Sequence, residues 1–97
     1  MPRPKKPRYL DFEPGVHYFK PQGVPLRQLD EVTLLADELE ALKLHEHDCL
    51  PQTEAAVKMQ ISQPTFARIL AASYQKIASA IIEGKAIRLE VNKPSEK

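Results

Sequence analysis

Hydrophobic residues recur at helical spacing through the middle of the chain. One apolar stripe consists of Leu35, Leu39 and Leu42. Side chains three and four residues apart share a helix face, so this spacing predicts a helix over Ala36–Glu46. Asp37 followed by Glu40 resembles a capping box, and we expect it to fix the start of this helix.

Two further helices are expected after a break in the pattern. Residues His47–Pro51 form a loop, because proline disfavours helix at the residue before it. A second helix is predicted over Gln52–Met59. A third begins at Ser62, whose side chain is a good N-cap, and continues until Gly84 ends it.

One apolar face runs along the third helix. It consists of Phe66, Ile69, Leu70, Ser73 and Ile77, and it continues through Ala78, Ile81 and Ile82. We expect this face to pack against the other helices, because a helix with one apolar stripe buries it in the core.

The ends of the chain have other patterns. Residues 1–25 hold six of the nine prolines and a run of cations, which predicts an extended basic N-terminal arm. Residues 26–84 form the helical domain, in which Leu26 and Leu29 already show helical spacing. Apolar and charged residues alternate near the C-terminus, which predicts a short strand within residues 85–91. Residues 92–97 are polar and are expected to be disordered.

The segment Gln52–Leu70 fits the template of a helix-turn-helix. The fit rests on small Ala56 at the helix crossing, on Met59 and Ile61 around the turn, and on Phe66 and Ile69 on the inner face. Gln60 stands at the turn position where glycine is commonest, because the backbone there needs a positive φ. The predicted fold is therefore mainly α-helical, with an extended N-terminal arm and a short C-terminal strand.

Several segments also carry a resemblance to a known family. They are Met1–Lys6, Tyr18–Leu26, Asp37–Leu44, Glu54–Ala56, Ile61–Leu70 and Gly84–Glu90. Over nearly its whole length the chain resembles the UPF0251 or DUF134 family of small predicted DNA-binding proteins. Its helical part also resembles the promoter-reading region four of sigma factors. This resemblance implies DNA binding of the kind used in transcription.

The outward face of the third helix is the candidate base-reading surface. We predict that Ser62–Lys76 is the recognition helix. Its outward residues are Gln63, Ala67, Arg68, Ala71 and Gln75. Short side chains let the helix approach base edges, while glutamine and arginine suit bidentate contacts to bases. The alternative interpretation is that the three helices simply pack together. Of these residues we expect Gln63, Ala67, Arg68 and Gln75 to contact bases.

Phosphate contacts are expected from the helix starts, from nearby cations and from the arm. The candidates are Gln52, Thr53, Lys58, Thr65 and Lys76 in the helical domain, and Arg3, Lys5, Lys6 and Arg8 in the arm. Two alternatives are equally open at this point: Gln52 and Thr53 serve as ordinary helix caps, and the arm is only a solvated tail. The net charge is +1, but the cations gather in the arm and between residues 55 and 88.

A metal site and an enzyme are both disfavoured. His45, His47 and Cys49 are ligand types that zinc prefers, but no second pair completes a tetrahedral site. We favour surface histidines at a helix end and a small buried cysteine. The chain also lacks a phosphate-binding glycine loop and a nucleophile with a base, so no enzyme activity, metal or cofactor is expected.

The sequence thus predicts a cytoplasmic, sequence-specific protein that binds double-stranded DNA and regulates transcription, with no membrane segment. We expect a homodimer, because one short recognition helix offers few contacts. Strand pairing or strand exchange between chains is expected at the edge formed by Ile87, Leu89 and Val91 with the aromatic N-terminal segment. The alternatives are a protein-interaction module that docks on a partner such as a polymerase subunit, and a metal or redox sensor.

Overall fold

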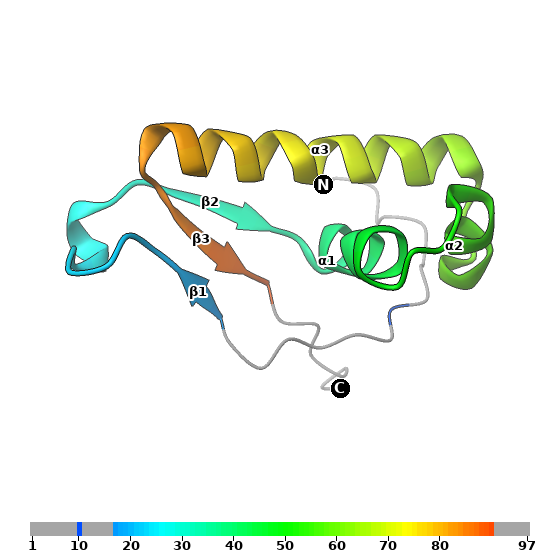
Figure 1. Ribbon diagram of the computed structural model, residues 1–97, viewed down its shortest axis with the longest axis horizontal. Helices are drawn as coiled ribbons and strands as arrows, with labels where there is room; N and C mark the ends of the chain where they lie inside the picture. The colour runs from blue at the N-terminus through cyan, green and yellow to red at the C-terminus, as the bar shows by residue number, and fades with distance from the viewer. Residues whose placement is uncertain (1–9, 11–16, 91–97) are drawn as a thin grey trace, which may run out of the picture.

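A long helix lies across a small sheet and two shorter helices (Figure 1). The structure, a computed structural model, describes Leu10 and residues 17–90. The elements in chain order are β1 (Tyr18–Phe19), the 3-10 turn η1 (Leu26–Gln28), β2 (Glu31–Leu34), α1 (Ala36–Leu42), η2 (Lys43–His47), α2 (Gln52–Met59), α3 (Gln63–Glu83) and β3 (Ala86–Leu89). The expected mainly helical class is confirmed, and a three-stranded sheet accompanies it.

The first helix forms where the leucine spacing predicts it, but its cap differs from the expected one. α1 begins after Leu35 and continues into η2, a wider helical turn. The N–H of Leu35 donates to Oε1 of Glu38 at 2.8 Å. Asp37 already lies inside the first turn of α1, so the expected pairing of Asp37 with Glu40 as a capping box is wrong. Glu38 performs that role because it stands three residues after the N-cap.

The bounds predicted for the next two helices are confirmed. α2 covers Gln52–Met59, and α3 starts directly after Ser62. The side chain of Ser62 accepts from the N–H of Thr65 at 3.2 Å. At the other end, Gly84 adopts a left-handed conformation with φ of 70°, which ends α3 and turns the chain into β3.

The sheet corrects two expectations. Glu31–Leu34 is a strand rather than part of a helical pattern, and it pairs in parallel with β3, with Val32 opposite Ile87. The expected C-terminal strand is confirmed as β3, but β3 is the central strand, with β1 antiparallel on its other side. Both edges of β3 are therefore occupied within the chain, and strand pairing between chains at Ile87 and Leu89 is wrong. Val91 lies outside the described residues.

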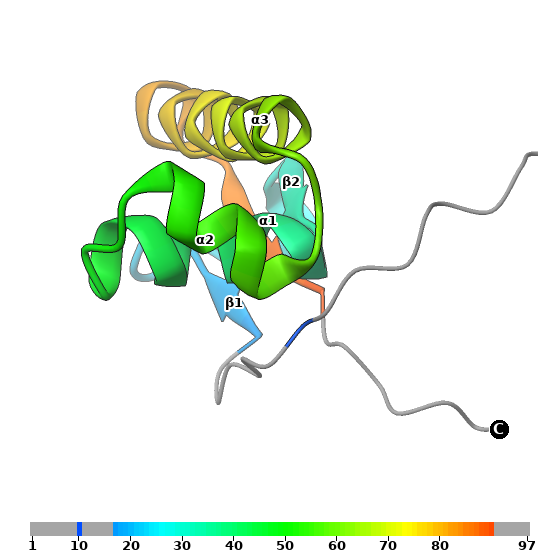
Figure 2. The ribbon, with the colours of Figure 1, turned by 90° about the vertical axis from the view of Figure 1, so that its right-hand side faces the viewer.

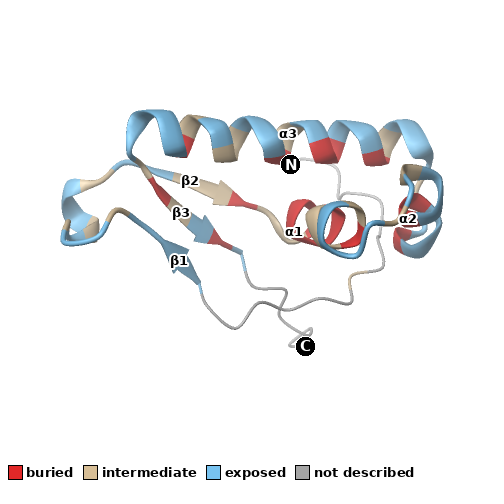
Figure 3. Ribbon diagram, in the orientation of Figure 1, coloured by how far each residue is buried: buried red, intermediate tan, exposed pale blue. Residues whose placement is uncertain are grey.

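Two hydrophobic clusters form the core. The larger joins α1, α2 and the first half of α3, and the smaller joins β2, α1 and β3. Figure 3 shows the buried residues of α3 on the side that faces these elements, while the opposite side is exposed along the helix. Ile81 and Ile82, expected to continue the packed face, are 69% and 82% exposed because the core does not reach their side of the helix.

Candidate nucleic-acid interface

A tight turn sets α2 and α3 against each other. The N–H of Ile61 donates to the carbonyl oxygen of Ala56 at 3.1 Å, and the N–H of Gln60 donates to the carbonyl oxygen of Val57 at 3.0 Å. These two bonds form the Schellman motif that commonly ends a helix. Gln60 has φ of 60°, as its position predicts. In Figure 2 the start of α3 faces the viewer, and α2 lies below α3, crossing in front of α1.

Buried apolar residues hold the two helices at this crossing. Ala56, Met59 and Phe66 are each at most 2% exposed, and Ile69 is 9% exposed. The small side chain of Ala56 lets the helices approach closely, while Phe66 fills the space between them. These are the residues that the sequence assigns to the inner side of the two helices.

The predicted base-reading residues share the exposed side of α3. Gln63, Ala67, Arg68, Ala71 and Gln75 are all exposed. Between Gln63 and Ala71 this surface carries one charged side chain, Arg68, among short or uncharged ones. The short side chains of Ala67 and Ala71 leave room beside Arg68 for close approach to a groove.

A short hydrogen-bonded chain orients Arg68. Oγ of Ser62 donates to Oγ1 of Thr65 at 2.9 Å, and a guanidinium nitrogen of Arg68 donates to the same Oγ1 at 3.4 Å. Thr65, a predicted phosphate contact, is half-buried and supports Arg68 from one turn earlier in the helix.

At the start of α2, Gln52 is half-buried and Thr53 is exposed. No side chain caps this helix, since Pro51 occupies the N-cap position. The alternative in which Gln52 or Thr53 is the N-cap is therefore wrong. The amides of the first turn are left for solvent or an anion, although Glu54 adds a negative charge to the same turn.

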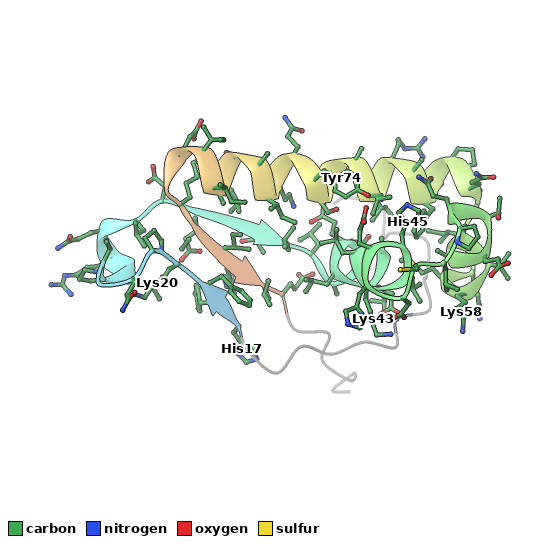
Figure 4. All side chains as sticks on the ribbon, viewed as in Figure 1. His17, Lys20, Lys43, His45, Lys58 and Tyr74 are labelled. Carbon is green, nitrogen blue, oxygen red and sulfur yellow. The ribbon has the colours of Figure 1, made fainter. Side chains whose placement is uncertain are left out.

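Two predicted phosphate contacts do not join this surface. Lys76 lies on the inner side of α3, where its Nζ donates to Oε1 of Glu38 at 2.9 Å and to the carbonyl of Thr33 at 2.7 Å. Lys58 is exposed, but Figure 4 shows it on the edge of α2 that points away from α3. Arg3, Lys5, Lys6 and Arg8 lie outside the described residues.

Comparison with known proteins identifies the family. The model of the family described as "Protein of unknown function DUF134" matches residues 1–93. The chain belongs to the DUF134 family. It is 51% identical over 90 residues to a UPF0251 protein of Moorella thermoacetica, an alignment that covers 93% of this chain and 60% of the relative.

A second relative matches an equally large share of the chain. The UPF0251 protein TTE1845 of Caldanaerobacter subterraneus subsp. tengcongensis is 52% identical over 90 residues, which make up 93% of this chain and 76% of the relative. This DUF134 chain thus spans less than two thirds of the Moorella relative. No solved structure matches it.

The candidate metal ligands of this DUF134 chain have other partners. Nδ1 of His45 lies 2.7 Å from the carbonyl oxygen of Leu50 and therefore carries its proton there. Cys49 is exposed, so the expectation of a buried cysteine is wrong: its φ of 62° places it in a bend of the loop before α2. Among residues 17–90 no three His, Cys, Asp or Glu side chains are grouped to hold a metal ion. Within residues 17–90, no helix is both long enough and apolar enough to span a membrane.

Tyr74 links the middle of α3 to η2. Its hydroxyl donates to a carboxylate oxygen of Glu46 (Figure 4). The pKa of Tyr74 is raised from 10.0 to about 12. The largest cause is burial, and the second is this hydrogen bond to an anion. The neutral phenol is thus favoured in the folded state, and its stabilising effect is lost as the pH rises from 10 through about 12.

We expect this bond to be visible in a titration. In Tyr74→Phe, the phenolate absorbance step that occurs near pH 12 in the parent chain should be absent, because no other group replaces that hydroxyl. Ultraviolet absorbance against pH measures it. A step of unchanged size near pH 12 in the variant would assign that titration to another tyrosine.

Proposed function

We propose that this chain binds double-stranded DNA in a sequence-specific way and regulates transcription in the cytoplasm, with the first half of α3 in the major groove. One observation carries the proposal: a two-helix unit with a left-handed turn at Gln60 carries an exposed surface of short side chains around one arginine. Helix-turn-helix proteins place the N-terminal residues of their second helix against base edges in this way.

Each part of the surface has a role in the proposal. Arg68 reads a base with two bonds, and Gln63 and Gln75 flank it on the exposed side of α3. Thr53 and the free amides at the start of α2 hold a phosphate. The basic residues of the arm add attraction to phosphates without sequence preference. Lys76 is left out, because it is paired with Glu38.

Replacement of Arg68 tests the proposal. Arg68 is exposed, so Arg68→Ala should fold normally. Loss of a bidentate contact to guanine should reduce discrimination between the preferred and other sequences by about 1–3 kcal/mol. The preferred sequence is first selected from random duplexes by the parent chain. Binding of that sequence and of a shuffled one is then measured at several salt concentrations.

The matched control is Arg27→Ala. Arg27 is an exposed arginine on η1, at the end of the molecule opposite α2 and the start of α3 (Figure 1), and its loss removes the same charge. The control should keep the preference of the parent chain. Equal preference in Arg68→Ala and the parent would contradict base reading by α3. Absence of any salt-dependent binding to DNA would instead favour a protein-interaction module.

A further inference from the structure

Three side chains at the start of α3 form a hydrogen-bonded row. The side chain of Ser62 accepts from the N–H of Thr65 at 3.2 Å, and its hydroxyl donates to Oγ1 of Thr65 at 2.9 Å. Nη2 of Arg68 donates to the same Oγ1 at 3.4 Å. We call Ser62, Thr65 and Arg68 the Arg68 row. Residues three apart are neighbours on a helix, so the start of α3 itself brings these side chains together.

Thr65 is suited to hold the side chain of Arg68. It is half-buried, while Ser62 and Arg68 are exposed. Its β-branched side chain has few rotamers in a helix, and Ser62 holds its hydroxyl from the other side. Helical side chains lean toward the N-terminus, so Arg68 reaches back over Thr65 in its ordinary direction. Thr65 therefore gives Arg68 an acceptor at a fixed place.

This acceptor is neutral, which leaves the charge of Arg68 for a ligand. The first turn of α3 carries no acidic residue. Among the described residues none forms an ion pair with Arg68. A carboxylate would hold the guanidinium more firmly, but it would also weaken the attraction of the guanidinium to DNA. The hydroxyl of Thr65 orients the guanidinium without neutralising it.

The bond from Nη2 also distinguishes the edges of the guanidinium. Two edges can make paired hydrogen bonds, and Nη2 contributes an N–H to both, beside Nε on one edge and beside Nη1 on the other. The bond to Thr65 uses one of these edges and leaves the other with two parallel N–H donors. Guanine presents O6 and N7 to such a pair of donors. The Arg68 row thus leaves one edge of Arg68 to read a base.

We propose that Thr65 is the positioning residue of Arg68: it fixes the edge of the guanidinium that meets the base and thereby sets the preference for guanine. This step rests on the proposed function, and it gives Thr65 a role in base choice in place of the phosphate contact predicted for it. Ordering a side chain with many rotamers before binding reduces the entropy that is lost on binding. This advantage arises only where Arg68 pairs with a base, so it increases the preference between sequences rather than the general affinity.

Substitution of Thr65 tests the proposal in duplex binding. Thr65→Val keeps the branched shape and the N–H that Ser62 caps, but it removes the hydroxyl. The ratio of the affinities for the selected and shuffled sequences should fall about three- to tenfold, and Thr65→Ser should keep it within about twofold of the parent ratio. In the Arg68→Ala background Thr65→Val should leave the ratio unaltered, because Thr65 acts through Arg68. Circular dichroism checks that each variant keeps its fold.

The matched control is Thr53→Val, which removes a hydroxyl from the proposed phosphate contact on α2. It should weaken binding of the selected and shuffled sequences alike. Equal weakening of both sequences by Thr65→Val would indicate a phosphate contact and overturn the positioning role. An undiminished effect of Thr65→Val in the Arg68→Ala background would overturn it as well.

Side-chain nuclear magnetic relaxation measures the positioning without DNA. The Nε order parameter of Arg68 should exceed that of the exposed Arg27, fall to the Arg27 value in Thr65→Val and recover in Thr65→Ser. An order parameter of Arg68 equal to that of Arg27 in the parent chain, or unchanged in Thr65→Val, overturns the proposal. Because this measurement omits DNA, absence of DNA binding would refute the proposed function while the hold of Thr65 on Arg68 is still decided.

Discussion

Replacing Phe66 with alanine should lower the free energy of unfolding by about 3–5 kcal/mol. Phe66 is fully buried in the cluster that joins α1, α2 and α3. Its ring also meets the ring of His45 edge to face, with centroids 6.4 Å apart. Truncation removes the aromatic surface and leaves a cavity between helices that relax only in part. Urea unfolding followed by circular dichroism measures the change.

The control for this variant is a truncation of similar chemistry on the surface. Val57→Ala, at a side chain 74% exposed on the neighbouring helix, should change the free energy by less than about 0.5 kcal/mol. A loss below about 1 kcal/mol in Phe66→Ala would mean that the crossing of α2 and α3 does not depend on this ring. The relation between the two helices would then need another explanation.

The helices of the two-helix unit could be predicted because their ends are set by local residues. Ser62 caps α3 through an amide three residues away, and Gly84 ends it with its own backbone conformation. The positive φ at Gln60 was likewise predictable, because Gln60 stands at the turn position between α2 and α3. Glutamine is an unusual residue at that position. Such features depend on few neighbours, so the sequence alone carries them.

The sheet could be predicted only in part, because its partners are distant in sequence. β2 has four residues, and its pairing with β3 joins Val32 to Ile87. A strand this short is stabilised by its partner rather than by its own pattern. The alternation near the C-terminus gave β3 correctly, but nothing in it showed that both of its edges would be covered.

The surface was less predictable than the core for the same reason. Periodicity assigns Ile81 and Ile82 to an apolar pattern, but whether a neighbour covers them depends on where α1 and the sheet end. Lys76 has the spacing of a surface cation, yet its partner Glu38 comes from another helix. Which cations lie unpaired on the surface is therefore decided by tertiary contacts.

Glu38→Ala should lower the free energy of unfolding by about 3 kcal/mol, at the lower end of the range for a broken buried ion pair. Oε1 of Glu38 accepts from the N–H of Leu35 at the start of α1 and from Nζ of Lys76 on α3. The side chain of Glu38 is 6% exposed and that of Lys76 is 31% exposed. Alanine would leave the Lys76 ammonium half-buried without its anion, and urea unfolding measures the cost.

A second substitution separates the lost pair from the lost cap. In Glu38→Ala with Lys76→Met the unpaired charge is gone and an apolar chain of similar length fills its place, so more than half of the stability should return. The remainder reflects the amide of Leu35 and the carbonyl of Thr33, both left without these partners. If the double variant is as unstable as Glu38→Ala, the ammonium is not the source of the loss. If Glu38→Ala costs less than about 1 kcal/mol, Lys76 finds solvent easily and is again a candidate for phosphate binding.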